Sequence, residues 1–436
     1  MESMKNLNNT FLKYFVFLML LLFICGTDSF AQPRFPQPEF ESGYVTPDTQ
    51  VVMPKGIWFD YMDIAVLLIL LTAATLFVLK YRWRTGVVIV SVLSIAYFGF
   101  YRVGCVCSVG SVQNVALALF QKSYIIPVSV IAFFTIPLVF TLFFGRTFCS
   151  GVCFFGAIQE LLIIKPLTIP VKYERLLSGI PYLYLVFGVL FAATGSDFII
   201  CRFDPFIGMF RFDGTAPVLI FGLILLLLST VIARPYCRFL CPYGVLLGWF
   251  SLVSKKGVSI TPSKCIQCKL CQNSCPVNAI RVPDLLQKPE VDGVRKLGWS
   301  LILFPVLIMA GGFAFSQLYK PLSTVHPTVN LAEEIHWEIK NNSKTNSENS
   351  KAFHSMGVPV EQLFSDASAI QSKFYTGLWW AGMFSGLFLA IAFIKLSVIR
   401  TPKIYEPDKF KCISCTRCYK FCPVDKVPET VLSGSA

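Results

Sequence analysis

Two stretches of this 436-residue chain share one cysteine pattern: CIQCKLCQNSCP at residues 265–276 and CISCTRCYKFCP at residues 412–423. In each stretch three cysteines have two other residues between one and the next. A fourth cysteine follows after three more residues, directly before a proline. This is the ligand run of bacterial ferredoxins, in which three thiolates hold one [4Fe–4S] cluster and the fourth ligates the neighbouring cluster. Structural zinc sites normally have longer spacers between their cysteine pairs. The repeated run therefore predicts two [4Fe–4S] clusters.

The exchange of the fourth ligand predicts which cysteines share a cluster. One cluster is expected on Cys265, Cys268, Cys271 and Cys422, and the other on Cys412, Cys415, Cys418 and Cys275. We assign the two ferredoxin halves to residues 255–297 and 398–436, with two apolar segments between them. Because an even number of membrane crossings returns a chain to the same face, both halves can join in one module.

The composition places the rest of the chain in a membrane. Hydrophobic residues make up 55% of the sequence and charged residues only 14%, where a soluble domain has about a quarter charged residues. Seven apolar runs come near the length that spans a bilayer as a helix: Met62–Leu79, Val87–Tyr101, Tyr124–Phe144, Ile180–Thr194, Pro217–Ala233, Trp299–Phe315 and Gly377–Ile394. We therefore expect an all-α polytopic membrane protein with about seven transmembrane helices and a small α+β ferredoxin-like module built from two separated segments.

The N-terminus resembles an export signal. Lys5 and Lys13 precede an apolar stretch at residues 15–24, and the small residues Ser29 and Ala31 follow. This order is typical of a signal peptide, which we assign to residues 1–31; a short uncleaved anchor is the alternative. Residues 32–61 would then form an exported N-terminal segment.

The charge distribution predicts the orientation of the remaining segments. Residues 62–254 form a five-helix membrane domain, residues 298–315 and 376–397 are the last two helices, and residues 316–375 form a periplasmic loop. Lysine and arginine are abundant in both ferredoxin halves, so the positive-inside rule places the halves in the cytoplasm, beneath a bacterial inner membrane. The formal charge of +13 is explained by this topology, and we expect no nucleic-acid partner.

The periplasmic loop has two parts of different character. Val329–Ile339 has the pattern of an acidic amphipathic helix, and the polar tract Asn341–Lys351 is expected to be flexible. The loop is either a plain connector or a docking surface for an exported partner.

Further cysteines repeat a second pattern. Cys149 and Cys153 form one C-x3-C pair, Cys237 and Cys241 form another that is followed by Pro242, and Cys105-Val-Cys107 is a fainter third copy. In each copy the last cysteine begins a C-x-x-G sequence. Cysteines four apart lie on one face of a helical turn, so the four thiols of the two pairs could converge on a further metal or cluster or act as redox dithiols, with plain packing as the alternative. Cys105, Cys107 and Cys201 are weaker candidates on the exported side, for a disulfide, a metal site or packing.

Other side chains restrict the chemistry. The three histidines all lie outside the apolar runs and the sequence contains no C-x-x-C-H, so we expect no haem. Glu160, near Cys153, is a candidate proton acceptor for quinol chemistry, but a capping or solvated carboxylate is the more usual role.

On the two ferredoxin runs and the C-x3-C sites at 149–153 and 237–242, the chain resembles the membrane polyferredoxin family, which includes NosR, NapH and CcoG. The resemblance covers about residues 60 to 430 and is nearest to the C-terminal part of NosR without its flavin-binding domain; Phe154 stands where the family has proline after the second cysteine. It implies electron transfer from the quinone pool towards a periplasmic reductase, with nitrous oxide reductase as a candidate, or towards a flavin-bearing partner. A CcoG-like copper reductase for metal-cofactor assembly and a redox-sensing regulator are the alternatives.

Overall fold

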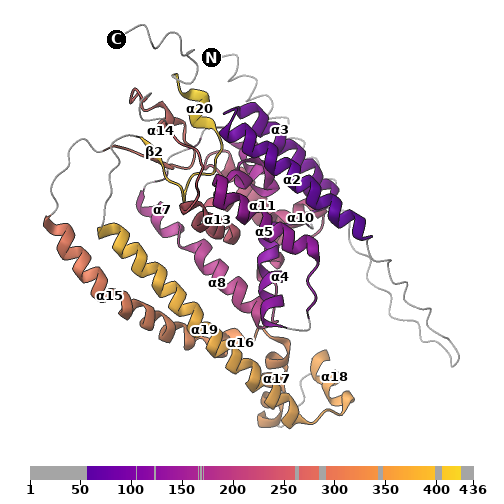
Figure 1. Ribbon diagram of the computed structural model, residues 1–436. Coiled ribbons are helices and arrows are strands. Elements are labelled where there is room, and N and C mark those ends of the chain that lie inside the picture. Colours follow the sequence, from indigo (N-terminus) through magenta and orange to yellow (C-terminus); the bar gives the residue numbers. More distant parts are fainter. Residues whose placement is uncertain are drawn as a thin grey trace, which may run out of the picture. The chain divides into compact units, whose positions relative to one another are not determined.

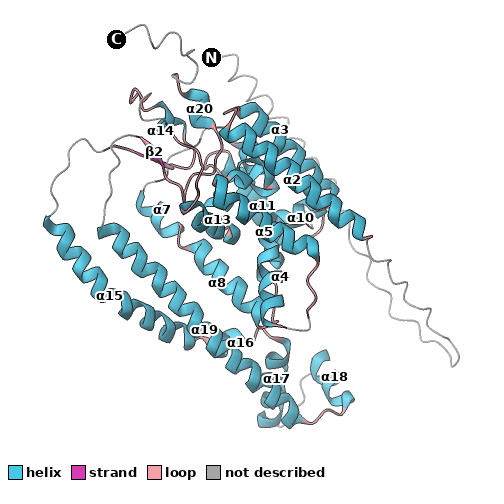
Figure 2. Ribbon diagram, in the orientation of Figure 1, coloured by secondary structure: helices cyan, strands magenta, loops and turns pink. Residues whose placement is uncertain are grey.

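The computed structural model describes residues 56–104, 106–121, 124–164, 166, 169, 171–260, 265–283, 291–341, 347–397 and 405–423. From Trp58 onward they belong to one compact unit. The regular secondary structure of the described part is helical, apart from two strands of two residues each (Figure 2). The predicted signal peptide and Cys105 lie outside the described residues, so those predictions are not tested.

Four described helices are long and apolar enough to cross a membrane. They are α2 (Ile57–Leu79), α3 (Arg84–Ser94) with its π-helical continuation η1 (Ile95–Tyr101), α15 (Val291–Ser316) and α19 (Val360–Ser397). The other three expected spans are also helical but shorter: α5 (Val128–Phe144), α8 (Ile180–Ala193) and α11 (Ala216–Ser229). A fourteen-residue helix is about 21 Å long, which is less than the hydrocarbon thickness of about 30 Å.

The count of seven spans is therefore not confirmed. Helix α11 follows α10 (Pro205–Arg211) at a bend of 103°, and this pair would make a fifth span if it crosses as one unit. The other helices of the membrane domain are α4 (Ser108–Phe120), η2 (Phe148–Val152), α6 (Phe154–Leu162), α7 (Val171–Leu177), α9 (Ile199–Arg202), α12 (Pro235–Phe239) and α13 (Pro242–Leu252). A large apolar core runs through the described part of this domain, and the cysteines of the C-x3-C pairs pack in it or against it.

Helices α15 and α19 pack through glycines. A Cβ atom on Gly382 would lie 2.1 Å from the carbonyl oxygen of Gly311, and one on Gly386 would lie 2.3 Å from that of Leu307. Small residues let two membrane helices approach closely enough for extensive van der Waals contact. This antiparallel pair connects the two ferredoxin halves along the chain (Figure 1).

A small apolar cluster forms where α17 (Pro327–Asn341) and α18 (Glu348–Met356) pack on the start of α19, after the short α16 (Tyr319–Ser323). The predicted helix Val329–Ile339 lies within α17 and is confirmed. The expectation of a flexible tract through Lys351 is wrong at its end, because α18 begins at Glu348. Ser347 caps this helix by accepting a hydrogen bond from the Ser350 amide.

The two ferredoxin halves form a common structure. Strand β1 (Ile280–Arg281) pairs antiparallel with β2 (Glu406–Pro407). Beside this pair of strands, Arg281 forms an ion pair of 2.7 Å with Asp408. Helix α14 (Leu270–Ser274) from the first half packs against α20 (Arg417–Phe421) from the second. Both helices lie near the end of the α2–α3 pair at which α2 is connected to α3 (Figure 1).

Candidate functional site

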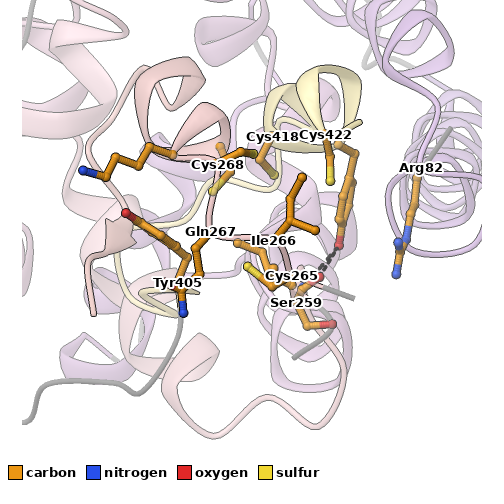
Figure 3. A pocket seen from close by; sticks show the side chains of 13 residues that line it. Arg82, Ser259, Cys265, Ile266, Gln267, Cys268, Tyr405, Cys418 and Cys422 are labelled. Carbon is orange, nitrogen blue, oxygen red and sulfur yellow. Dashed lines mark hydrogen bonds between the residues drawn. The ribbon is translucent and has the colours of Figure 1, made fainter. Parts of the chain in front are cut away.

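The first cavity of the ferredoxin region is lined by cysteines from both halves. Cys265, Cys268 and Cys271 enter it from the first half, and Cys418 and Cys422 enter from the second (Figure 3). Tyr419 lies at the same cavity, and its hydroxyl exchanges hydrogen bonds of 3.1 Å with the backbone of Ser259. The Arg82 guanidinium, from the loop between α2 and α3, lies 4.6 Å from the Tyr419 ring, so a cation–π contact joins this cavity to the membrane helices.

The second cavity is lined by Cys275 from the first half and Cys412, Cys415 and Cys418 from the second. Its other walls are mostly aliphatic, among them Val277, Ala279, Ile280 and Ile413. Cys418 lines both cavities, so the two sites adjoin.

The backbone repeats itself in the two cysteine runs. Gln267 and Lys269 in the first run have positive φ angles of 54° and 61°, and Ser414 and Thr416 at the matching positions of the second have 56° and 61°. Non-glycine residues adopt this left-handed conformation rarely. Alternation of right- and left-handed residues turns successive backbone N–H groups to one side and forms anion-binding concavities that are found around iron–sulfur clusters.

These observations fit [4Fe–4S] groups, because each cavity presents at least four thiols, largely apolar walls and a nest-forming backbone. The division of the eight cysteines into two ligand sets stays a prediction.

The second ferredoxin half is docked on the membrane domain by hydrogen bonds from side chains of that domain to backbone carbonyl groups of the half. Arg84 donates to the carbonyl of Cys415 at 2.8 Å, and Arg146 donates to that of Phe410 at 2.8 Å. Ser251 donates to the carbonyl of Lys409 at 2.7 Å. Side chains on three separate membrane-domain segments thus fix the loop that carries Cys412 and Cys415.

Glu160 on α6 is the centre of a buried ion-pair cluster. Its side chain is 1% exposed and contacts three guanidinium groups: Arg84 at 2.5 Å, Arg234 at 2.8 Å and Arg417 at 2.9 Å. Burial alone would raise the pKa of Glu160, but Arg234, Arg417 and Arg84 together lower it to about 2. The expectation of a capping or solvated carboxylate is therefore wrong, and a carboxylate held so strongly in its charged form is a poor proton acceptor.

The three arginines were missed by the sequence reasoning. Arg417 lies inside the second cysteine run, between Cys415 and Cys418, so the Glu160 cluster connects that run to the C-x3-C repeat. Arg234 also donates to the carbonyl oxygens of Cys149 and Ser150. No local sequence pattern predicts these partners, because they come together only through the tertiary fold.

Each C-x3-C pair crosses a break between two helices. Cys149 lies in η2 and Cys153 is the N-cap of α6, while Cys237 lies in α12 and Cys241 is the N-cap of α13. The expectation that each pair shares one face of a single helical turn is therefore wrong, because the second cysteine in each pair has extended backbone angles.

The two C-x3-C pairs nevertheless lie close to each other, on either side of Gly156. A Cβ atom on Gly156 would lie 3.6 Å from the Cys237 sulfur and 3.5 Å from the Cys149 carbonyl oxygen. Gln159 Nε2 lies 3.5 Å from the Cys237 sulfur, and Arg146 Nη2 lies 3.8 Å from that of Cys149. Cys149 also packs on the apolar cluster that contains Cys415. The paired thiols thus lie beside the ferredoxin cavities.

The third copy of the pattern lies within the membrane domain, on α4. Cys107 is the N-cap of α4, and its sulfur accepts a hydrogen bond from Val109, much as the Cys241 sulfur accepts one from Gly244. Cys107 and Cys153 line a common small apolar cavity. The Cys201 sulfur is 2.9 Å from the position of a Cβ atom on Gly110, one turn along α4. Among the described residues, no three His, Cys, Asp or Glu side chains are arranged to hold a single metal ion.

Comparisons with known proteins agree with this chemistry. Two families, both described as 4Fe-4S binding domain, match residues 126–166 with 215–261 and residues 258–281. YccM of Escherichia coli, a protein named for electron transport, is 31% identical over 36% of this chain and 48% of its own length. The regulatory protein NosR of Pseudomonas aeruginosa is 28% identical over 47% of this chain and 30% of its own length.

NirI of Paracoccus denitrificans is 32% identical over 32% of this chain and 22% of its own length. The chain thus spans about half or less of these three relatives. No solved structure matches the chain.

Proposed function

The chain is a member of the NosR- and NapH-like membrane polyferredoxin family, and from this premise we propose that it transfers electrons between the quinone pool and a redox partner through two [4Fe–4S] clusters. The observation that carries the proposal is the pair of adjoining cavities, each lined by cysteines from both ferredoxin halves. Bound there, the clusters would supply reversible one-electron chemistry.

The residues of the chain would hold and insulate these groups. Cys265, Cys268, Cys271 and Cys422 would ligate one cluster, and Cys412, Cys415, Cys418 and Cys275 the other. The aliphatic walls of the second cavity exclude water, which is one of the properties that set a cluster's reduction potential. Arg84 and Arg146 fix the loop of the second set from the membrane side.

The C-x3-C thiols are proposed as a further redox centre, either a metal cluster or a pair of dithiols. One matching 4Fe-4S binding family covers residues 126–166 and 215–261. These segments contain Cys149, Cys153, Cys237 and Cys241 and none of the eight ferredoxin cysteines. The contact of Cys149 with the cluster around Cys415 supports a role next to the ferredoxin module.

The finer parts of the proposal rest on the topology and on the relatives. The ferredoxin module would face the cytoplasm at the bacterial inner membrane, with the N-terminus exported. The likeness to NosR supports a periplasmic reductase as the partner, nitrous oxide reductase among the candidates. That relative is named a regulatory protein, which supports a redox-sensing regulator as a second candidate function. A copper-reducing assembly factor is the third.

The test is electron paramagnetic resonance on anaerobically purified protein, before and after addition of a quinol. The proposal predicts cluster signals that appear on reduction by quinol and disappear on addition of an oxidised acceptor. Clusters that no quinol reduces would contradict a quinol-fed carrier. Stoichiometric copper binding with copper reduction would favour the assembly role instead.

A further inference from the structure

The two cysteine runs differ in their exposure to solvent. Residues 266–269 of the first run are all exposed, whereas residues 413–416, at the matching positions of the second run, are all buried. Cys268 accordingly lies at the surface, and its counterpart Cys415 lies inside. A soluble protein can therefore approach the first ferredoxin cavity directly, through the wall to which Cys268 belongs (Figure 3).

The second cavity faces the membrane domain instead. Arg84 donates a hydrogen bond to the carbonyl of Cys415, and Cys149 packs on the apolar cluster that contains Cys415. The two cavities adjoin at Cys418. The first cavity is thus the one that a soluble protein can reach, and the second connects it to the membrane domain.

Apolar side chains surround the exposed edge of the first cavity. Ile266 is 64% exposed, and Leu270 at the start of α14 is also exposed. Phe421 at the end of α20 is 52% exposed and directly precedes Cys422, which lines the cavity. Because α14 packs against α20, these side chains lie on neighbouring elements. Apolar and aromatic residues of this kind form the centre of protein–protein interfaces, within a polar rim.

The charged side chains at this edge are basic. Lys269 in the first cysteine run and Lys420 in the second are both exposed. Among the described residues that line the first cavity, the charged ones are Lys269 and Arg82, and none is acidic. Glu406, which lies in the neighbouring strand pair, is directly opposite Arg281. We call Ile266, Lys269, Leu270, Lys420 and Phe421 the outer edge.

The properties of the outer edge define the partner. Complexes that exchange electrons have small interfaces, of less than about 1,200 Å², and complementary charge speeds their encounter. A basic rim around a small apolar centre therefore fits an acidic protein. A [4Fe–4S] cluster exchanges one electron at a time, so the partner must carry single electrons.

We propose that the outer edge is the docking surface for a soluble, acidic protein that carries one electron at a time, with Lys269 and Lys420 facing its carboxylates and Phe421 in the apolar centre. In the exchange the reduced carrier loses one electron and this chain gains it, and no bond forms or breaks. The proposal rests on the clusters of the proposed function and goes beyond it, because it adds a soluble carrier to the quinone pool.

The test is an anaerobic binding titration of the full chain in nanodiscs of zwitterionic lipid, with an oxidised, acidic plant-type [2Fe–2S] ferredoxin as the probe. Oxidised probe measures docking without electron transfer. We expect saturable binding that weakens about tenfold or more between about 0.01 M and about 0.1 M salt, because the Debye length falls from about 30 Å to about 10 Å over this range.

Charge reversal at both lysines, Lys269→Glu with Lys420→Glu, should weaken binding by about tenfold or more, since like charges would then face each other. The matched control is Lys340→Glu with Lys373→Glu, which makes the same change in charge at exposed positions of α17 and α19 and should leave the affinity unchanged. Phe421→Ala keeps the charge and should weaken binding by about tenfold through loss of an aromatic anchor.

Absence of saturable binding at low salt would overturn the proposal, as would binding that the control pair weakens as much as the Lys269 and Lys420 pair. Size-exclusion profiles identify a variant that fails to fold, and Phe421→Ala then decides. Iron content and dithionite-reduced spectra of the same samples test the proposed function separately. Intact clusters without carrier binding would remove only the docking surface, whereas a chain without clusters would remove the proposed function, whatever it binds.

Discussion

Replacement of Glu160 by glutamine should loosen the second ferredoxin half from the membrane domain. Glutamine keeps the shape of the side chain but removes the negative charge shared by Arg84, Arg234 and Arg417. Three guanidinium groups would then lie together without a counter-ion, one of them on a side chain that is fully buried.

The magnitude follows from two independent arguments. Loss of one partner of a buried ion pair costs about 3–5 kcal/mol. The pKa of Glu160 falls from an ordinary 4.5 to about 2, and at about 1.4 kcal/mol per pH unit this corresponds to about 3–4 kcal/mol of stabilisation of the charged form. We therefore expect a loss of about 3 kcal/mol or more in the free energy of unfolding.

The assay is chemical unfolding of the anaerobic protein, followed through cluster absorbance and intrinsic fluorescence. Asp197→Asn is the matched control, because its ion pair with Arg202 is exposed and should be worth at most about 1 kcal/mol. If Glu160→Gln and Asp197→Asn unfold alike, the ion-pair cluster does not hold the ferredoxin half in place.

Four further predictions follow from particular contacts. Because the pKa of Glu160 is lowered on folding, its stabilisation is complete above about pH 4.5 and is lost as the pH falls towards 2; acid unfolding of the parent should contain this component, and that of Glu160→Gln should lack it. Cys422→Ser should abolish the spectrum of one cluster and Cys275→Ser that of the other, as read by electron paramagnetic resonance; loss of the same cluster in both variants would contradict the ligand exchange. Gly382→Ala should destabilise the α15–α19 pair because its Cβ would meet the Gly311 carbonyl at 2.1 Å, whereas Gly298→Ala, with no atom within 4 Å, should be neutral or slightly stabilising in a thermal assay. Cys241→Ser should lower the iron content per chain if the C-x3-C thiols hold a cluster, and unchanged iron would leave only the dithiol role.

Much of the fold was predictable because membrane helices and ferredoxin loops have local signatures. Apolar runs predicted seven helices, and all seven are helical. The number of spans was not predictable in the same way, because α8 and α11 end after fourteen residues. Hydropathy detects an apolar stretch, but it does not show where the backbone bends, as it does by 103° between α10 and α11.

The candidate site also has parts that the local sequence predicts and parts that it does not. The cysteine spacing predicted two cysteine-lined sites, since three of the cysteines in each run lie within seven residues of each other, and both cavities are lined by cysteines; the division into two ligand sets stays a prediction. The spacing of Cys149 and Cys153 was less informative, because a helix break lies between them. The partners of Glu160 depend on contacts between segments far apart in sequence, such as that with Arg417, and no local pattern indicates them.

The most direct test of the central claim is the content of iron and acid-labile sulfide in full-length protein prepared without exposure to air. The account predicts at least two [4Fe–4S] clusters per chain, with one cluster lost when Cys265, Cys268 and Cys271 are replaced by serine together. Protein that is folded and monodisperse but holds no iron or sulfide would contradict it.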